Sequence, residues 1–218
     1  MRDDFRLWLI RHGETAHNID GVFQGQLDTP LNARGHEQAR QTGIALAPLG
    51  FSRIYSSDLA RAADTARAVA GPLGIQINFD PRLRELHYGV LQGVRYGDFR
   101  EVLAQHGMEG DWGPGVFSQQ GMAAPGGESL DDLLSRLEAF VGELIETADS
   151  ASDVAVVAHG GTLRTLLTTF LGMPATSRDK LAMSNCGVSR VHYAGGRWRL
   201  EFHNRVYWDT SATDGRDA

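Results

Sequence analysis

Two histidines stand directly after apolar runs, and their positions suggest chemistry. His12 follows the apolar residues 5–10, with Arg11 between them, and His159 follows the apolar residues 154–158. In open α/β sheets, ligands bind outside the carboxyl ends of the strands. The sequence therefore predicts one site built from two distant histidines and an arginine.

A metal-free phosphoryl-transfer site has three requirements, and the chain offers a candidate for each. A phosphate monoester carries nearly two negative charges at neutral pH, which Arg11 and Arg61 could hold with bidentate hydrogen bonds. A neutral imidazole has a lone pair for attack on phosphorus, which makes His12 the candidate nucleophile. Glu85, in a loop near a strand end, is the candidate proton donor and base. The two glycines after His159 suggest backbone N–H groups that approach the phosphate.

Strand-like and helix-like segments alternate along the chain, which is typical of an α/β sheet with helices on its faces. Strands are predicted at residues 5–10, 53–56, 75–79, 154–158, 186–193 and 198–203, the last two joined as a hairpin. Helices are predicted from an Asn32 cap to about residue 47, from Ser57 or Asp58, at 96–106, from a Ser129 capping box and at 162–171, with a short turn capped by Thr15.

Length and composition predict a single domain. The 218 residues fit one domain at 1–208 with a lid-like insertion at about 94–128, part of which is rich in Gly, Pro, Ser and Gln. The polar tail at 209–218 is predicted to be disordered.

Composition also argues against several classes of protein. The net charge of -6 disfavours nucleic acid as a partner. The single cysteine, Cys186, excludes a disulfide framework and is expected in the core. No apolar run approaches membrane-spanning length, and Asp3 and Asp4 are unlike a signal peptide. We therefore expect a cytoplasmic protein without a nucleic-acid or membrane partner.

A set of motifs in order along almost the whole chain carries a family resemblance. The motifs are Leu9-Ile10-Arg11-His12-Gly13-Glu14-Thr15 followed by Asn18, Gln24-Gly25, Asp28-Thr29-Pro30-Leu31, Arg34-Gly35, Ser56-Ser57-Asp58-Leu59-Ala60-Arg61-Ala62, Leu83-Arg84-Glu85-Leu86, Gly126-Gly127-Glu128-Ser129 and Ala158-His159-Gly160-Gly161. Together they closely resemble the histidine phosphatase superfamily, also called phosphoglycerate mutase-like.

The resemblance implies a three-layer α/β/α sandwich with a mostly parallel sheet. It also implies that His12 becomes a transient phosphohistidine, while Arg11, Arg61 and His159 hold the phosphoryl oxygens. Glu85 would protonate the leaving group and then activate water. No metal or other cofactor is expected, because arginine and histidine supply the positive charge.

Further residues are candidates for contact with the substrate. By resemblance, Asn18, Gln24 and Gly25 would line the phosphate or substrate pocket. Tyr88, close to Glu85 in the sequence, and Gly160 are additional candidates. The expected partner is a small phosphorylated metabolite, and neither its identity nor the oligomeric state follows from the sequence.

The superfamily contains phosphatases and phosphoglycerate mutases, and the sequence has features of both. Tyr88-Gly89 and Leu91-Gln92-Gly93 look like the mutase pattern, whereas many small phosphatases carry Trp-Glu-Gly at the positions of Leu91-Gln92-Gly93. Against the mutase, residues 107–127 contain no lysine or arginine, Tyr96 stands where mutases usually carry lysine, and Gly160-Gly161 resembles the phosphatases. A mutase must retain a highly charged bisphosphate intermediate, so the missing cations favour a phosphatase.

Two alternatives to the phosphatase stay open at this point. The first is a phosphoglycerate mutase that depends on 2,3-bisphosphoglycerate. The second is a non-catalytic module that binds a phosphorylated ligand. The presence of all five core residues, His12, Glu85, Arg11, Arg61 and His159, disfavours the binding module.

Overall fold

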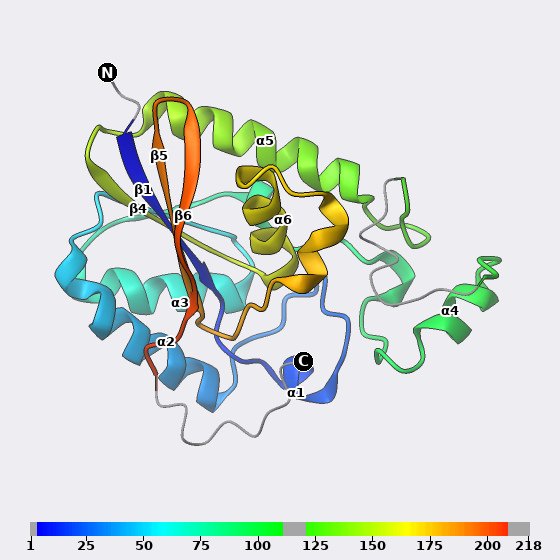
Figure 1. Ribbon diagram of the computed structural model, residues 1–218. Coiled ribbons are helices and arrows are strands. Elements are labelled where there is room, and N and C mark those ends of the chain that lie inside the picture. The colour runs from blue at the N-terminus through cyan, green and yellow to red at the C-terminus, as the bar shows by residue number, and fades with distance from the viewer. Residues whose placement is uncertain (1–3, 111–120, 209–218) are drawn as a thin grey trace.

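The computed structural model describes residues 4–110 and 121–208, in which six strands form a single sheet (Figure 1). The strand order is β3-β2-β4-β1-β5-β6. The strands are β1 (Asp4–Arg11), β2 (Arg53–Ser56), β3 (Ile77–Phe79), β4 (Ser152–Ala158), β5 (Val188–Ala194) and β6 (Arg197–Arg205). Strands β1 to β4 run parallel, and β5 is antiparallel to both its neighbours. The mostly parallel sheet is confirmed.

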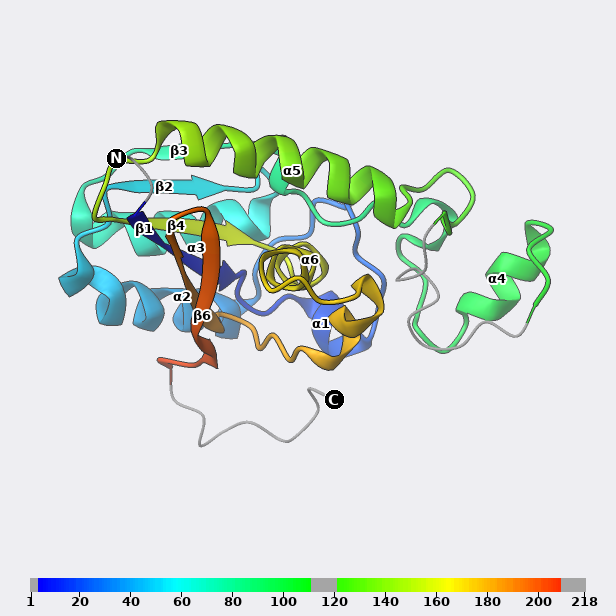
Figure 2. The same cartoon turned by 45° about the horizontal axis from the view of Figure 1, so that its top comes forward.

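Helices cover both faces of the sheet (Figures 1 and 2). One face carries α2 (Ala33–Leu46) and α3 (Ala60–Ala70), and the other carries α5 (Leu130–Thr147) and α6 (Gly160–Phe170). The shorter elements are α1 (Ala16–Asp20), α4 (Phe99–Gln105) and the 3-10 turns η1 (Ala47–Leu49), η2 (Gly71–Leu73), η3 (Pro81–Leu83), η4 (Gly89–Leu91) and η6 (Ala175–Lys180). The three-layer α/β/α sandwich is confirmed.

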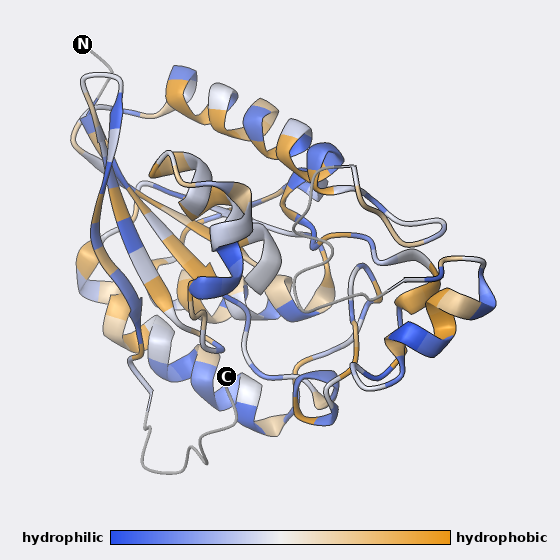
Figure 3. Cartoon of the chain, turned by 45° about the vertical axis from the view of Figure 1, so that its right-hand side comes forward, coloured by the Kyte–Doolittle hydropathy of each residue, from blue (hydrophilic) through white to orange (hydrophobic). Residues whose placement is uncertain are grey.

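The apolar run of β1 explains the two faces, because successive side chains of a strand point to opposite sides of its sheet. Leu7 and Leu9 belong to the core under α5 and α6, whereas Trp8 and Ile10 belong to the core under α2 and α3. Figure 3 shows hydrophobic residues along the strands between these layers. No helix in the described part of the chain is long and apolar enough to cross a membrane.

The register of β1 and β4 brings the two histidines to one edge of the sheet. These parallel strands are adjacent, and Arg11 at the end of β1 pairs with Ala158 at the end of β4. The next residues are His12 and His159, whose ring centroids lie 5.2 Å apart. The predicted meeting of the two strand ends is therefore present.

Most helix starts agree with the prediction. Thr15 and Ser129 form capping boxes at α1 and α5, and Asn32 accepts a hydrogen bond of 2.7 Å from the Gly35 N–H at α2. Other ends differ by about two residues, as element boundaries commonly do. The largest such shift at a functional position is in α3.

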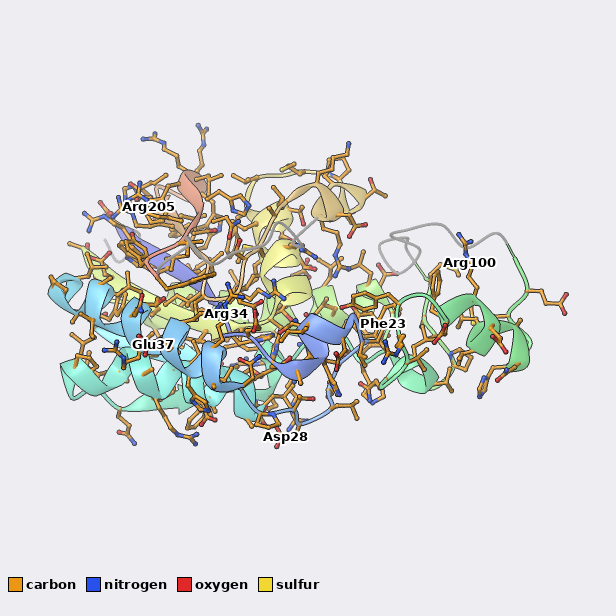
Figure 4. All side chains as sticks on the ribbon, turned by 90° about the horizontal axis from the view of Figure 1, so that it is seen from below. Phe23, Asp28, Arg34, Glu37, Arg100 and Arg205 are labelled. Carbon is orange, nitrogen blue, oxygen red and sulfur yellow. The ribbon has the colours of Figure 1, made fainter. Side chains whose placement is uncertain are left out.

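Helix α3 begins at Ala60 and not at Ser57 or Asp58, as predicted. The Asp28 carboxylate accepts a hydrogen bond of 2.6 Å from the Ala60 N–H, so a distant loop caps this helix. Figure 4 shows Asp28 at the edge of the molecule. Ser57 is instead fully buried beside His159.

The segment that was predicted as an insertion lies beside the sheet (Figures 1 and 2). Its helix α4 is shorter than the predicted 96–106. Phe23 packs against the rings of Tyr96 and Phe99 at centroid distances of 4.6 and 6.2 Å. Figure 4 shows Phe23 on the side of the sheet domain that faces this segment, which carries Arg100. Residues 111–120 and the predicted disordered tail at 209–218 lie outside the described residues.

Candidate active site

His12 is held in a fixed position at the end of β1. Its N–H donates to the Ala158 carbonyl at 2.9 Å, and its own carbonyl accepts from the Cys186 N–H and the Asn185 side chain. Nδ1 of the ring lies 2.7 Å from the Gly13 carbonyl oxygen. A carbonyl can only accept, so Nδ1 carries the proton and Nε2 keeps a free lone pair.

The surroundings of His12 favour its neutral form. Burial, followed by the positive charges of Arg61 and Arg11, lowers the pKa of His12 well below 6.5. Its side chain is thus an uncharged imidazole at neutral pH.

His159 has the opposite arrangement of ring protons. Arg61 Nε donates to Nδ1 of His159 at 3.1 Å, so the ring proton of neutral His159 lies on Nε2, 2.8 Å from Ser57 Oγ. Burial, then the charge of Arg61, lowers the pKa of His159 well below 6.5. One histidine therefore offers a lone pair, and its neighbour offers an N–H donor.

Arg61 is almost completely buried and partly used by the protein itself. Its Nη1 and Nη2 donate at 2.7 Å to the carbonyls of Leu27 and Gly25, in addition to the bond with His159. A guanidinium has five N–H groups, so two remain for a ligand. Burial lowers the pKa of Arg61 to about 10, which leaves it charged at neutral pH.

Gly25 contributes through its backbone. It has a φ of +52°, a region that favours glycine, and a Cβ there would lie 2.3 Å from Gln92 Oε1. The Gly25 carbonyl accepts a hydrogen bond from Arg61 Nη2 and so helps to orient the Arg61 guanidinium.

Arg11 lies between the start of α6 and the loop before β5. Its Nη1 donates to the Met183 carbonyl. A Cβ on Gly160 would lie 3.5 Å from Arg11 Nε, which is an ordinary van der Waals contact, so the start of α6 lies directly beside Arg11. Arg11 is the last residue of β1 and Gly160 follows the end of β4 by two residues, so both lie at the edge of the sheet where the site was predicted.

The start of α6 corrects one expectation. The N–H groups of Gly161 and Thr162 donate to the Glu85 carboxylate at 2.8 and 3.1 Å and are therefore not free to approach a phosphate. The Leu86 N–H also donates to Glu85, at 2.9 Å. The N–H groups at the start of α6 therefore hold the candidate acid and base in place.

The loop that carries Glu85 is fastened by Arg136, which the sequence reasoning missed. Arg136 on α5 donates to the carbonyls of Arg84 and Glu85 at 2.7 and 3.0 Å and forms an ion pair of 2.8 Å with Glu128. Glu128 also accepts from the His87 N–H. The only sequence signal was Glu128 in the motif before α5.

The candidate substrate residues Asn18 and Gln24 meet at Thr15. Their side-chain oxygens each lie 3.0 Å from the Thr15 hydroxyl, whose single proton is donated to one of them at a time. Asn18 Oδ1 also lies 3.3 Å from Asn185, which bonds to the His12 carbonyl. Their carboxamide NH₂ groups are therefore the parts available to a ligand.

Tyr88 is half-buried near Glu85, as the sequence suggested. Burial, followed by the charge of Glu85, raises the pKa of Tyr88, so its hydroxyl stays protonated. Its ring packs on Phe23 at 5.1 Å, the same residue that contacts the α4 segment.

The mutase-like segment at Leu91-Gln92-Gly93 has a structural explanation. Gln92 Oε1 accepts from the Gln26 N–H at 2.7 Å and so shapes the loop that carries Gly25. A glutamate oxygen would supply the same acceptor. This position therefore does not separate a mutase from a phosphatase.

The five predicted core residues thus form one cluster. The His12 and His159 rings are adjacent, and Arg61 donates a hydrogen bond to His159. Burial and the charges of Arg61 and Arg11 lower the pKa of His12, and the charge of Glu85 partly offsets the lowering of the Arg61 pKa by burial. Within residues 4–110 and 121–208, no three His, Cys, Asp or Glu residues are arranged to hold a metal ion.

Comparison with known proteins identifies the family. Residues 7–206 match the model of the histidine phosphatase superfamily (branch 1), so the chain belongs to this superfamily and is a histidine phosphatase-type enzyme.

Relatives in this superfamily have different named activities. A probable phosphoglycerate mutase GpmB of Salmonella newport is 38% identical over 193 residues, which covers 88% of this chain and 87% of the relative. The alpha-ribazole phosphatase of Shigella flexneri has a TM-score of 0.81 and 30% identity, covering 92% of this chain and 96% of that chain. A mycobacterial glucosyl-3-phosphoglycerate phosphatase solved with VO3 has a TM-score of 0.77 and 32% identity, covering 91% and 98%.

Proposed function

We propose that this protein is a metal-independent phosphomonoesterase that acts on a small phosphorylated metabolite through a phosphohistidine at His12. The observation that carries the proposal is the His12 ring. Nδ1 is bonded to the Gly13 carbonyl, and burial beside two arginines favours the neutral form. A neutral imidazole with an oriented Nε2 lone pair is what attack on phosphorus requires.

The neighbouring groups match the charge of a phosphoryl group. Arg11 and the two remaining N–H groups of Arg61 offset its negative charge. His159 donates from Nε2 once a phosphoryl oxygen replaces Ser57 Oγ as the acceptor. The NH₂ groups of Asn18 and Gln24 provide further donors, and Gly160 lies beside Arg11.

Glu85 completes the reaction in two steps. In the first, Nε2 of His12 bonds to phosphorus, the P–O bond to the leaving group breaks, and the acid form of Glu85 protonates the departing oxygen. In the second, water attacks phosphorus, its proton returns to Glu85, and the P–N bond breaks. Phosphate and an alcohol are released, and both residues regain their starting states. Tyr88, beside Glu85, borders the leaving group.

A phosphoglycerate mutase is the second candidate, favoured by the 38% identical relative that carries this name. A mutase must keep a bisphosphate until it is transferred back. Residues 107–127 contribute no lysine or arginine to retain it, and Gln92 has a structural role. We therefore favour hydrolysis.

The test is a pair of assays on the wild type and His12→Asn. Protein incubated with a ³²P-labelled monoester and quenched in alkali, in which a phosphohistidine is stable, should carry label in the wild type and none in His12→Asn. The wild type should also release phosphate in the presence of EDTA. In parallel, 3-phosphoglycerate is supplied with and without 2,3-bisphosphoglycerate. Bisphosphate-stimulated 2-phosphoglycerate would establish the mutase, and equal turnover by His12→Asn would exclude the proposed nucleophile.

A further inference from the structure

One buried cation in the described structure has no evident task within the protein. Arg178 on η6 is only 4% exposed, and its Nε and Nη1 have no hydrogen-bond partner among the described residues. By contrast, Arg61 makes three side-chain hydrogen bonds at a similar burial. Buried donors without partners cost free energy and are rare in native proteins, so such a group requires an explanation.

The position of Arg178 connects it to the proposed reaction. A Cβ built on Gly161 would lie 2.9 Å from Arg178 Nη2 and 2.4 Å from Glu85 Oε1, so the guanidinium and the carboxylate border the same point. Among the described residues the two form no ion pair, and N–H groups of Leu86 and of the start of α6 donate to the Glu85 carboxylate. The charges of Glu85 and Arg178 both act on Tyr88.

Glu85 also defines which end of a substrate lies near Arg178. In the proposed function, Glu85 protonates the leaving oxygen, so the leaving group must approach this carboxylate closely. Arg178 is then beside the leaving group, while Arg11 and Arg61 serve the phosphoryl group.

We propose that Arg178 binds a carboxylate on the leaving group, so that the substrate is a phosphomonoester of a hydroxy acid. This inference rests on the proposed function. A planar guanidinium matches a carboxylate with two parallel hydrogen bonds, and one cation balances one negative charge. Arg164, whose charge also acts on Tyr88, adds positive potential on the same side.

The test compares substrates that differ only in the carboxylate. One pair is 3-phosphoglycerate and glycerol 3-phosphate, and a shorter pair is 2-phosphoglycolate and 2-hydroxyethyl phosphate. For at least one pair, kcat/KM of the wild type should be higher for the acid by about 10- to 100-fold, the size of a charge-assisted hydrogen bond.

Substitution of Arg178 should remove this preference selectively. Arg178→Gln should lower kcat/KM for the acid toward that of the alcohol and leave the alcohol within about threefold, and Arg178→Lys should retain part of the preference. The control is Arg197→Gln on the exposed start of β6, which removes the same charge far from the site. An equal loss for both members of a pair, or a wild type without preference, would overturn the inference.

The two proposals fail in different ways. If the wild type hydrolyses monoesters without preferring the acids, only the carboxylate site is wrong. If it hydrolyses none, the proposed function is wrong. The carboxylate site is then tested separately, by calorimetric measurement of how tightly the acid and the alcohol of each pair bind to His12→Ala. Tighter binding of the acid that disappears in the His12→Ala, Arg178→Gln double variant would support it, and equal binding would refute it.

Discussion

At the scale of single residues, hydrogen-bond partners give the two histidines different properties. The Gly13 carbonyl leaves His12 with a lone pair at Nε2, whereas Arg61 leaves His159 with a proton at Nε2. The same residue type therefore supplies a nucleophile and a donor in adjacent positions. Glycines then control how closely the neighbouring groups can approach.

Gly161 provides a prediction at this scale. In Gly161→Ala, the new Cβ would lie 2.4 Å from Glu85 Oε1, so the carboxylate must move. We expect kcat for an alkyl phosphate to fall roughly 100-fold, because small displacements of a catalytic group are costly. The loss should be smaller for nitrophenyl phosphate, whose leaving group needs little protonation.

The control for this prediction is Gly142→Ala on α5, where a Cβ meets nothing within 4 Å. It should leave both rates unchanged and stabilise the helix by up to about 1 kcal/mol, because alanine has the higher helix propensity. Steady-state kinetics and thermal unfolding measure both variants. Gly161→Ala with activity within threefold of wild type on the alkyl ester would contradict the assigned position of Glu85.

At the scale of elements, three segments distant in sequence cooperate to hold the acid. The loop after η3 carries Glu85, the start of α6 binds its carboxylate, and Arg136 of α5 binds the backbone of the loop. Removing one of these contacts should therefore affect chemistry more than binding.

Arg136→Gln is the corresponding prediction. It leaves the carbonyls of Arg84 and Glu85 without their donor, which should lower the free energy of unfolding by about 1–3 kcal/mol. Because Glu85 is displaced, kcat for alkyl phosphates should fall about tenfold or more, with a smaller fall for nitrophenyl phosphate and little change in KM.

Arg40→Gln is a matched control on α2, because it breaks an exposed ion pair with Glu37. The Glu37 side chain is about half exposed, with 49% of its surface accessible. This substitution should leave the free energy of unfolding almost unchanged, because exposed ion pairs contribute little to stability. If Arg136→Gln lowered the rates for both substrates equally, Arg136 would support the fold without positioning Glu85.

At the scale of the whole molecule, burying two neutral histidines links stability to pH. The pKa values of His12 and His159 lie well below 6.5 in the folded protein, whereas unfolding returns them to about 6.5. Below pH 6.5 the unfolded state therefore binds more protons than the folded state. Acidification consequently favours unfolding until the folded pKa values are reached.

We expect the free energy of unfolding to fall as pH decreases below 6.5. The slope is at most about 1.4 kcal/mol per pH unit for each histidine. Urea unfolding at several pH values between 7.5 and 5 measures this slope. In His12→Asn the slope should be smaller by up to about 1.4 kcal/mol per pH unit, because one fewer proton is bound on unfolding. A slope in His12→Asn equal to that of the wild type would show that His12 is not buried in its neutral form.

Local sequence patterns are sufficient to predict the alternation of strands and helices, the strand ends and the residues proposed for the site. The apolar runs at residues 5–10 and 154–158 specify buried strands, and caps such as Thr15, Asn32 and Ser129 mark helix starts. These signals are local, so they can be read without knowing which segments meet.

The contacts that these residues make depend on how distant segments pack together. No local pattern indicates that Asp28 caps α3, that α6 binds Glu85, or that Arg136 fastens its loop, because each contact joins segments at least 32 residues apart. Arg178 likewise has the sequence context of an ordinary surface arginine. Burial and the absence of partners depend on how the layers pack, and that packing makes it the candidate for recognising the leaving group.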